Sequence, residues 1–119
     1  MANWKQLKVD VQELDESAAV VYRLSGLLTD TSDAFQLLDR IREDMEKPAK
    51  RFIVDLTGVP HVTSAGVGIL AAAYTSAQRN EKQLVVTGPA SRVESLLKLV
   101  GLWDLLEHHD TVEQALGQS

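Results

Sequence analysis

The stretch RFIVDLTGVPHVTSAGVG, residues 51–68, joins a strand pattern to a helix pattern. It opens with the apolar, β-favouring run Phe52-Ile53-Val54, which is typical of a strand buried on both faces of a sheet. Gly58 and Pro60 then interrupt regular strand pairing, because one lacks a Cβ and the other lacks a backbone donor. From Val67 onward the apolar residues follow helical spacing. We therefore expect a buried strand, a short loop and a long helix.

Two hydroxyl residues, Thr63 and Ser64, lie at the predicted start of this helix. A hydroxyl there can accept a hydrogen bond from a free N–H of the first turn, and the helix dipole would stabilise a phosphate. Ser64 thus has two compatible interpretations, a plain N-cap and a phosphorylated residue. Gly66 and Gly68 each weaken the helix by about 1 kcal/mol relative to alanine. We expect them to permit close packing of helix on sheet, with partner contact as the less favoured alternative.

The rest of the chain predicts an α/β fold in a single domain, residues 1–119. The further strands are expected around Leu7–Val11, at Ala18–Leu24, which pairs with the first as a hairpin, at Gln83–Thr87, and around Leu105-Leu106 as a short edge strand. One further helix is expected after the cap cluster 29–33, and Pro48 stops it. Another begins at the capping box Ser91–Glu94 and ends at Gly101, and the last begins at Asp110–Glu113. Alternating strands and helices imply parallel neighbours joined by right-handed crossovers. The result is a mixed sheet of four to five strands with about four helices packed against it, and the central loop lies at the carboxyl end of a parallel strand, where sites are found.

Composition narrows the classes of partner and activity. The net charge of −5 argues against nucleic acid, and no apolar stretch is long enough for direct membrane insertion. The absence of cysteine fits a reducing compartment, so we expect a cytoplasmic protein. His61, His108 and His109 lack metal-ligand spacing, and the Gly66-x-Gly68 pair lacks the rest of a dinucleotide fingerprint. We therefore expect no metal and no cofactor.

Several motifs, taken in order, point to a family. Arg23-Leu24-Ser25-Gly26 resembles a strand-ending R-L-x-G, Ile53-Val54-Asp55-Leu56 resembles an I-V-L-D-L run, and residues 62–68 resemble a V-x-D-S-S-G-L-G loop. Residues 97–102 and 110–116 resemble the carboxyl end of the same family. The chain thus resembles a stand-alone STAS domain, the module shared by bacterial anti-sigma factor antagonists and the cytoplasmic tails of sulfate transporters.

The resemblance implies a regulatory switch and not an enzyme. In antagonists of this family, the serine matching Ser64 is phosphorylated by an anti-sigma factor that is also a serine kinase; the unmodified form binds this kinase and the phosphorylated form releases it. The implied partner-binding residues are Thr29, Asp30, His61, Val62, Thr63, Ser64, Ala65 and Val67. The residues expected to shape the loop are Gly26, Asp55, Gly66 and Gly68, with Asp55 bonding loop amides.

This chain departs from the family pattern at two positions. Thr63 precedes Ser64 where many antagonists carry an acid, and Thr29 follows the R-L-x-G motif where they often carry another. Thr63 thereby becomes a second candidate for phosphorylation. Threonine at this loop also resembles unphosphorylated STAS accessory subunits, so the alternative function is a constitutive subunit of a transporter ATPase of the lipid-transport type. A small nucleotide-binding enzyme ranks last, because the sequence offers no convincing base, metal site or P-loop lysine.

Overall fold

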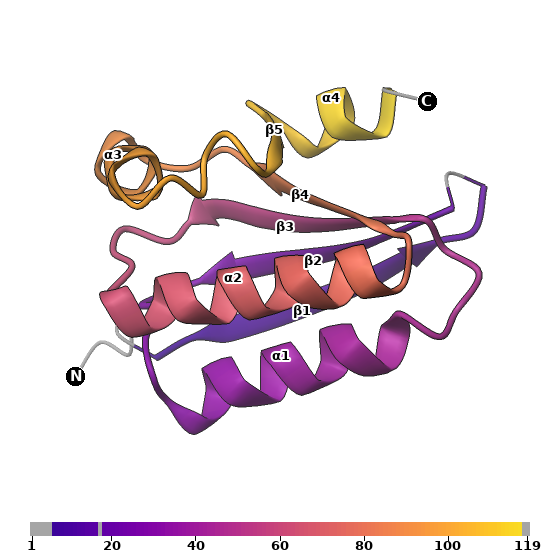
Figure 1. The fold of residues 1–119 in the computed structure, drawn as a ribbon, viewed down its shortest axis with the longest axis horizontal. Coiled ribbons are helices and arrows are strands. Elements are labelled where there is room, and N and C mark those ends of the chain that lie inside the picture. Colours follow the sequence, from indigo (N-terminus) through magenta and orange to yellow (C-terminus); the bar gives the residue numbers. More distant parts are fainter. Residues whose placement is uncertain (1–5, 17, 118–119) are drawn as a thin grey trace.

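The apolar run at Phe52-Ile53-Val54 lies in the middle strand of a five-stranded sheet with the order β1-β2-β3-β4-β5 (Figure 1). The structure, a computed structural model, describes residues 6–16 and 18–117. Over these residues the elements are β1 (Lys8–Leu14), β2 (Ala19–Ser25), α1 (Ser32–Asp44), β3 (Arg51–Gly58), α2 (Ser64–Arg79), β4 (Gln83–Thr87), α3 (Ser91–Leu99), β5 (Glu107–His109) and α4 (Val112–Gly117). The predicted order of elements, the α/β class and the mixed sheet are confirmed.

The sheet topology places the loops that matter at one edge. β1 pairs antiparallel with β2, whereas β2, β3, β4 and β5 run parallel to one another. The carboxyl ends of the parallel strands therefore meet at the same edge, and α1 and α2 begin there (Figure 1). The start of α2, with Ser64 as its first residue, lies at this edge.

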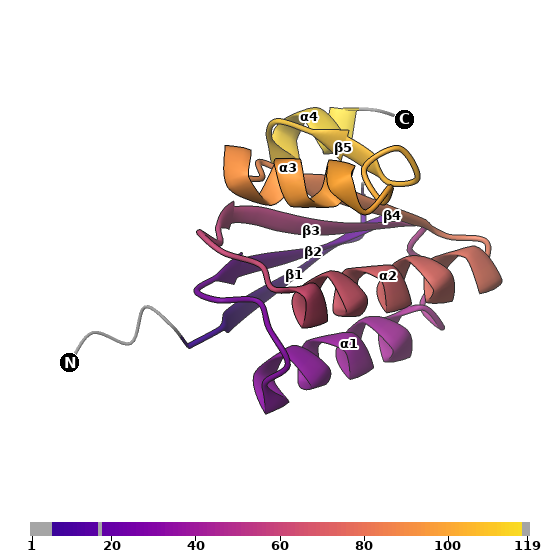
Figure 2. The ribbon, with the colours of Figure 1, turned by 60° about the vertical axis from the view of Figure 1, so that its left-hand side comes forward.

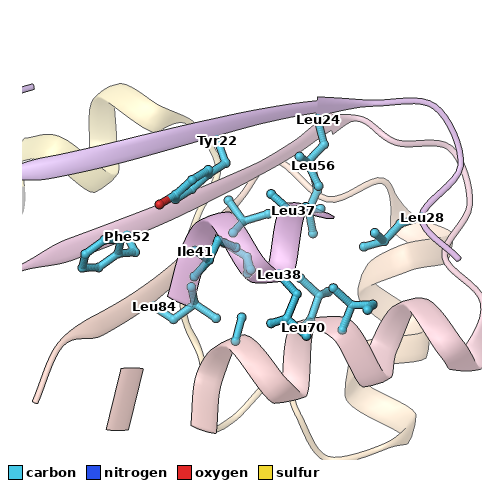
Figure 3. Close-up of a cluster of buried hydrophobic side chains, with 14 of the residues drawn as sticks. Tyr22, Leu24, Leu28, Leu37, Leu38, Ile41, Phe52, Leu56, Leu70 and Leu84 are labelled. Atoms are coloured by element: carbon cyan, nitrogen blue, oxygen red, sulfur yellow. The ribbon is translucent and has the colours of Figure 1, made fainter. Parts of the chain in front are cut away.

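The helices cover the two faces of the sheet unequally. Figure 2 shows α1 and α2 on one side of the sheet and α4 on the other. The side facing α1 and α2 holds the larger apolar cluster, part of which is drawn in Figure 3; its fully buried side chains include Tyr22, Leu28, Phe52 and Leu70. The side facing α4 holds a smaller cluster of Ala19, Val21, Ile53, Val85, Val112 and Ala115. No helix of the described residues is long and apolar enough to cross a membrane.

The helix caps differ from the prediction by one residue at three helices. Thr63 caps α2, so the interpretation of Ser64 as the N-cap is wrong. Ala90 precedes α3 without a side-chain cap, so the predicted capping box at Ser91–Glu94 is not formed. At α4 the cap is Thr111, whose Oγ1 accepts the N–H of Gln114 at 3.1 Å, in place of the predicted Asp110. The starts of α2 and α4 each offer neighbouring capping residue types, and sequence alone does not say which one has extended backbone. At α3 the cap position is held by Ala90, which has no capping side chain.

Other boundaries of helices and strands also differ from the prediction. The last edge strand is Glu107–His109, because Leu105 and Leu106 form a turn in which both N–H groups donate to the Leu102 carbonyl. α1 ends at Asp44, before the residue that was expected to stop it, Pro48. Gly101 does end α3 as predicted: its φ is +80° and the Leu102 N–H reaches back to the Leu97 carbonyl.

Candidate functional site

Two loops that are distant in sequence form one surface beside the start of α2. Leu28, in the loop between β2 and α1, donates its N–H to the His61 carbonyl at 3.2 Å and accepts the Thr63 N–H at 3.1 Å. These two bonds form an isolated parallel bridge between Leu28 and Val62. The Leu28 side chain is fully buried and holds the loop onto the core. The loop at residues 26–31 and the loop at residues 59–63 are therefore fixed to each other.

Glycine is required where these loops approach the helix. A Cβ on Gly66 would lie 2.2 Å from the Leu28 carbonyl oxygen, closer than any real contact. Gly26, which leads into the first loop, has a φ of +99°, a conformation that other residues rarely adopt. Gly68 differs, because nothing lies within 4 Å of a Cβ built there and the residue is exposed. Gly66 is thus required for a close approach, but to the loop that holds Leu28 and not to the sheet as expected, and the packing role expected for Gly68 is wrong.

The hydroxyl of Thr63 both accepts and donates a hydrogen bond. Its Oγ1 accepts the Gly66 N–H at 3.2 Å and donates to Thr29 Oγ1 at 2.7 Å. Thr29 in turn donates to Asp30 Oδ1 at 3.2 Å. The two positions at which the chain departs from the acidic family pattern thus touch each other, and the carboxylate at this surface is supplied by Asp30.

Ser64 has different surroundings from those of its neighbour. It is exposed as the first residue of α2, and no hydrogen bond engages its side chain among residues 6–16 and 18–117. The first N–H groups of a helix have no partner within the helix, and the dipole is positive there. The Ser64 hydroxyl is therefore accessible at a place where added negative charge is stabilised.

The other residues predicted to contact a partner differ in how deeply they are buried. Ala65 is exposed, and His61 and Val62 are partly exposed beside Ser64. Val67 packs into the larger apolar cluster with only 9% of its surface exposed. Val67 therefore supports the loop surface from below, and the expectation that it contacts a partner is not met by its position.

Asp55 has a structural position, as expected, although its partners differ from those predicted. Its Oδ1 accepts hydrogen bonds from the hydroxyls of Thr57 at 2.7 Å and Thr87 at 2.9 Å, and Arg23 lies 3.7 Å from Oδ2. The amide N–H of Thr57 also donates to Oδ1, at 3.4 Å, but Thr57 lies within β3 and not in the loop. Because side chains alternate along a strand, Asp55 shares the face of Ile53, which packs towards α4. It therefore joins the ends of β2, β3 and β4 on the face away from α2.

Sequence reasoning missed Arg92, the second residue of α3. Its guanidinium NH1 lies 3.2 Å from Nδ1 and 3.1 Å from Nε2 of His61. The available signal was topological: β3 and β4 are parallel neighbours, so the segment that follows β4 lies beside the loop that follows β3. Figure 1 shows α3 next to the carboxyl end of β3.

The chemistry offered by this surface is that of recognition. It presents one free hydroxyl, a chain of hydrogen-bonded hydroxyls ending at Asp30, and the Arg92 cation. Within the described part of the chain, no three His, Asp or Glu side chains come together as a metal site would require. His108 and His109 diverge: His108 stacks on Trp103 with ring centroids 3.8 Å apart, and His109 Nε2 contacts Glu107 at 2.8 Å.

Comparison with known proteins shows which family the chain resembles in sequence and in fold. The sequence model of the STAS domain matches residues 8–115. An anti-sigma-B factor antagonist of Listeria monocytogenes is similar to the chain, with 33% identity over 45% of this chain and 47% of its own length. The chain thus matches about half the length of this relative.

Solved structures show the same fold. An anti-sigma factor antagonist from Mycobacterium paratuberculosis superposes with a TM-score of 0.80 at 22% identity, over 98% of this chain and 96% of the other. The Bacillus cell fate determinant SpoIIAA in its phosphorylated form superposes with a TM-score of 0.72 at 18% identity, over 92% and 96% of the two chains.

Proposed function

Because the chain belongs to the STAS domain family, we propose that it is a regulator of the anti-sigma factor antagonist type, whose binding to a serine-kinase anti-sigma factor is switched by phosphorylation of Ser64. The observation that carries this proposal is the exposed Ser64 hydroxyl, without a hydrogen-bond partner in the described residues, at the first position of α2. The relatives named as anti-sigma factor antagonists support the general role.

The geometry supports Ser64 over Thr63 as the phosphorylated residue. Phosphorylation of Thr63 would turn the oxygen that accepts the Gly66 N–H into a bridging ester oxygen, a poorer acceptor, and would remove the proton that is donated to Thr29. Ser64 can take a phosphoryl group from ATP with loss of only its own hydroxyl proton and of no contact within the described chain. Thr63 is therefore the structural neighbour of the switch.

A phosphate on Ser64 acts by two opposite effects. Within the protein, the first turn of α2 stabilises its charge. At an interface, nearly two negative charges must lose water and face whatever the partner presents, which weakens binding. A switch requires only that the two forms differ in affinity. A tenfold difference corresponds to about 1.4 kcal/mol, which a charge of this size readily supplies.

The test uses a purified serine-kinase anti-sigma factor from the same genome, ATP, and mass spectrometry of the modified chain. We expect one phosphate, on Ser64, in the wild type and in Thr63→Ser, and none in Ser64→Ala. Calorimetry should show that the unmodified chain binds the kinase at least tenfold more tightly than the phosphorylated chain. A phosphate on another residue, or equal affinities, would contradict the proposal.

A second candidate function rests on the Thr29–Thr63 contact. Two neutral hydroxyls replace the acids expected there, which fits a surface that binds its partner constitutively, as an accessory subunit of a transporter ATPase would. In that case the chain copurifies with a membrane ATPase complex, and neither Ser64→Ala nor Ser64→Glu changes the yield. Loss of the complex in Ser64→Glu alone would favour the phosphorylation switch.

A further inference from the structure

Arg92 is a cation without a carboxylate partner at the edge of the loop surface. Arg23, Arg40 and Arg51 are each paired with a carboxylate in the sheet or in α1. Among the residues that the structure describes, no carboxylate pairs with Arg92, which is exposed and contacts the ring of His61 instead. The contact is with an imidazole ring and not with a carboxylate, so the guanidinium remains available to an anion.

Arg92 lies on the same surface as Ser64. Its guanidinium contacts the ring of His61, in the loop that leads into α2. His61 precedes Ser64 by three residues, which span at most about 11 Å even when fully extended. A guanidinium presents parallel N–H groups that match two oxygens of a phosphate, a geometry that a lysine does not offer.

The charges at the surface explain why such a cation matters. The loop after β2 places Asp30 at this surface, the loop after β3 places His61 there, and α3 places Arg92 there. Asp30 is linked through Thr29 to Thr63, so its carboxylate opposes a second negative charge on the neighbouring Ser64. Arg92 is the group at this surface that offsets this repulsion.

We propose that Arg92 binds the phosphoryl group of phosphorylated Ser64 and holds it against the protein's own surface. The inference rests on the proposed function only in taking Ser64 as the site of the phosphate. In the unmodified protein Arg92 rests on His61. After modification it moves to the phosphate, so the two forms differ in the position of α3's first side chains as well as in charge. A partner then meets a changed surface on both Ser64 and α3.

The experiment introduces phosphoserine at position 64 during translation, so that no kinase is needed. The second pKa of the phosphate is measured by phosphorus NMR from pH 4.5 to 8 in the otherwise wild-type chain, in Arg92→Gln, and in Arg79→Gln. Arg79 ends α2 about 22 Å from Ser64 along the helix axis, so this control removes the same charge beyond the screening distance. Histidine rings titrate in the same range, so the ring protons of His61 are followed in the same samples.

We expect the phosphate pKa to lie about 0.3 to 0.7 of a unit lower in the wild type and in Arg79→Gln than in Arg92→Gln, as for an exposed charge pair. Arg92→Lys should recover only part of the difference, because lysine lacks the paired donors. The thermal unfolding midpoint of each unphosphorylated variant checks that the loop surface is folded.

Equal phosphate pKa values in Arg92→Gln and Arg79→Gln would overturn the proposal. So would a loss of kinase binding in unphosphorylated Arg92→Gln without any change in that pKa, because Arg92 would then be a partner contact. A failure of the kinase to modify Ser64 contradicts the proposed function but leaves the NMR comparison intact. The two proposals therefore fail separately.

Discussion

Gly66 and Gly68 lie two residues apart in the first turns of α2 and have opposite surroundings. A side chain on Gly66 would overlap the Leu28 backbone, which cannot move without breaking the bridge to Val62. A side chain on Gly68 would point into open space. The sequence shows two equivalent helix-weakening residues, and only the fold separates the one that is required from the one that is not.

We expect Gly66→Ala to lower the free energy of unfolding by about 2 to 3 kcal/mol, the usual cost of forcing an extra methyl group into a packed contact. Gly68→Ala should raise it by up to about 1 kcal/mol, through helix propensity. Urea denaturation of both variants measures the difference. Equal stabilities would show that the loop at residues 26–31 is not held against α2 as described.

The carboxyl end of α1 is tied to the sheet by a buried acid. Asp44 is 2% exposed and accepts hydrogen bonds from the Tyr22 hydroxyl at 2.6 Å and from Arg40 Nε at 3.0 Å, while Lys47 Nζ lies 3.1 Å away. Burial alone would raise the pKa of Asp44. The bonds from Tyr22, Lys47 and Arg40 outweigh burial and hold the pKa below its usual value.

This pKa shift predicts acid sensitivity. A carboxyl whose pKa is lower in the folded state stabilises the fold fully above its unfolded pKa of about 3.9, and this contribution is lost as pH falls through the folded value. We expect Asp44→Asn to cost about 1 to 3 kcal/mol of unfolding free energy at pH 7. The gap between variant and wild type should close below about pH 4 in denaturation series. A gap that persists unchanged at pH 2.5 would contradict the assignment.

At the scale of elements, the strands and the buried helix faces could be predicted, because apolar periodicity reports them directly. The run Phe52-Ile53-Val54 became the centre of the sheet, and the capping hydroxyls were placed within one residue of the true helix starts. Which hydroxyl caps a helix depends on backbone angles that neighbouring loops impose, as Leu28 does at Thr63. Because β5 is short and polar, no apolar pattern in the sequence indicates that it pairs with β4.

The whole molecule has one thick apolar layer and one thin one, divided by the sheet. α4 and β5 close the thin side through Arg51, whose guanidinium contacts the Glu107 carboxylate and donates to the Ala115 carbonyl at 2.9 Å. Burial alone would raise the pKa of Glu107, but Arg51 and His109 lower it overall. Few apolar contacts support this end of the chain, so we expect it to open before the central strands do.

Glu107→Gln should accelerate amide hydrogen exchange across residues 107–117 by about threefold to tenfold, while β2 and β3 keep their protection. Glu94→Gln is the matched control, because the Glu94–Lys98 pair is exposed and lies within α3 alone. Mass spectrometry of the exchanged peptides measures both variants. Uniform acceleration over the whole chain would show that the thin layer does not open as a separate unit.

Only the part of the candidate site that is formed by residues close together in the sequence could be predicted. Ser64, Thr63 and Gly66 follow from the strand-to-helix pattern and from the family resemblance. The Leu28–Val62 bridge, the Thr29–Thr63 contact and the Arg92–His61 contact join segments about 30 residues apart. Such contacts depend on strand register, which propensities do not encode.

The Arg51 contact with Ala115 has a practical use. It fixes α4 beside the first residue of β3, whereas Ser64 follows the last one, and a strand of this length spans about 25 Å. A fluorophore or surface anchor attached at Gly117 would therefore sit at the far end of the molecule from Ser64. Immobilised in that orientation, the protein offers its two joined loops to solution, where binding of the proposed partner can be timed with and without a phosphate on Ser64.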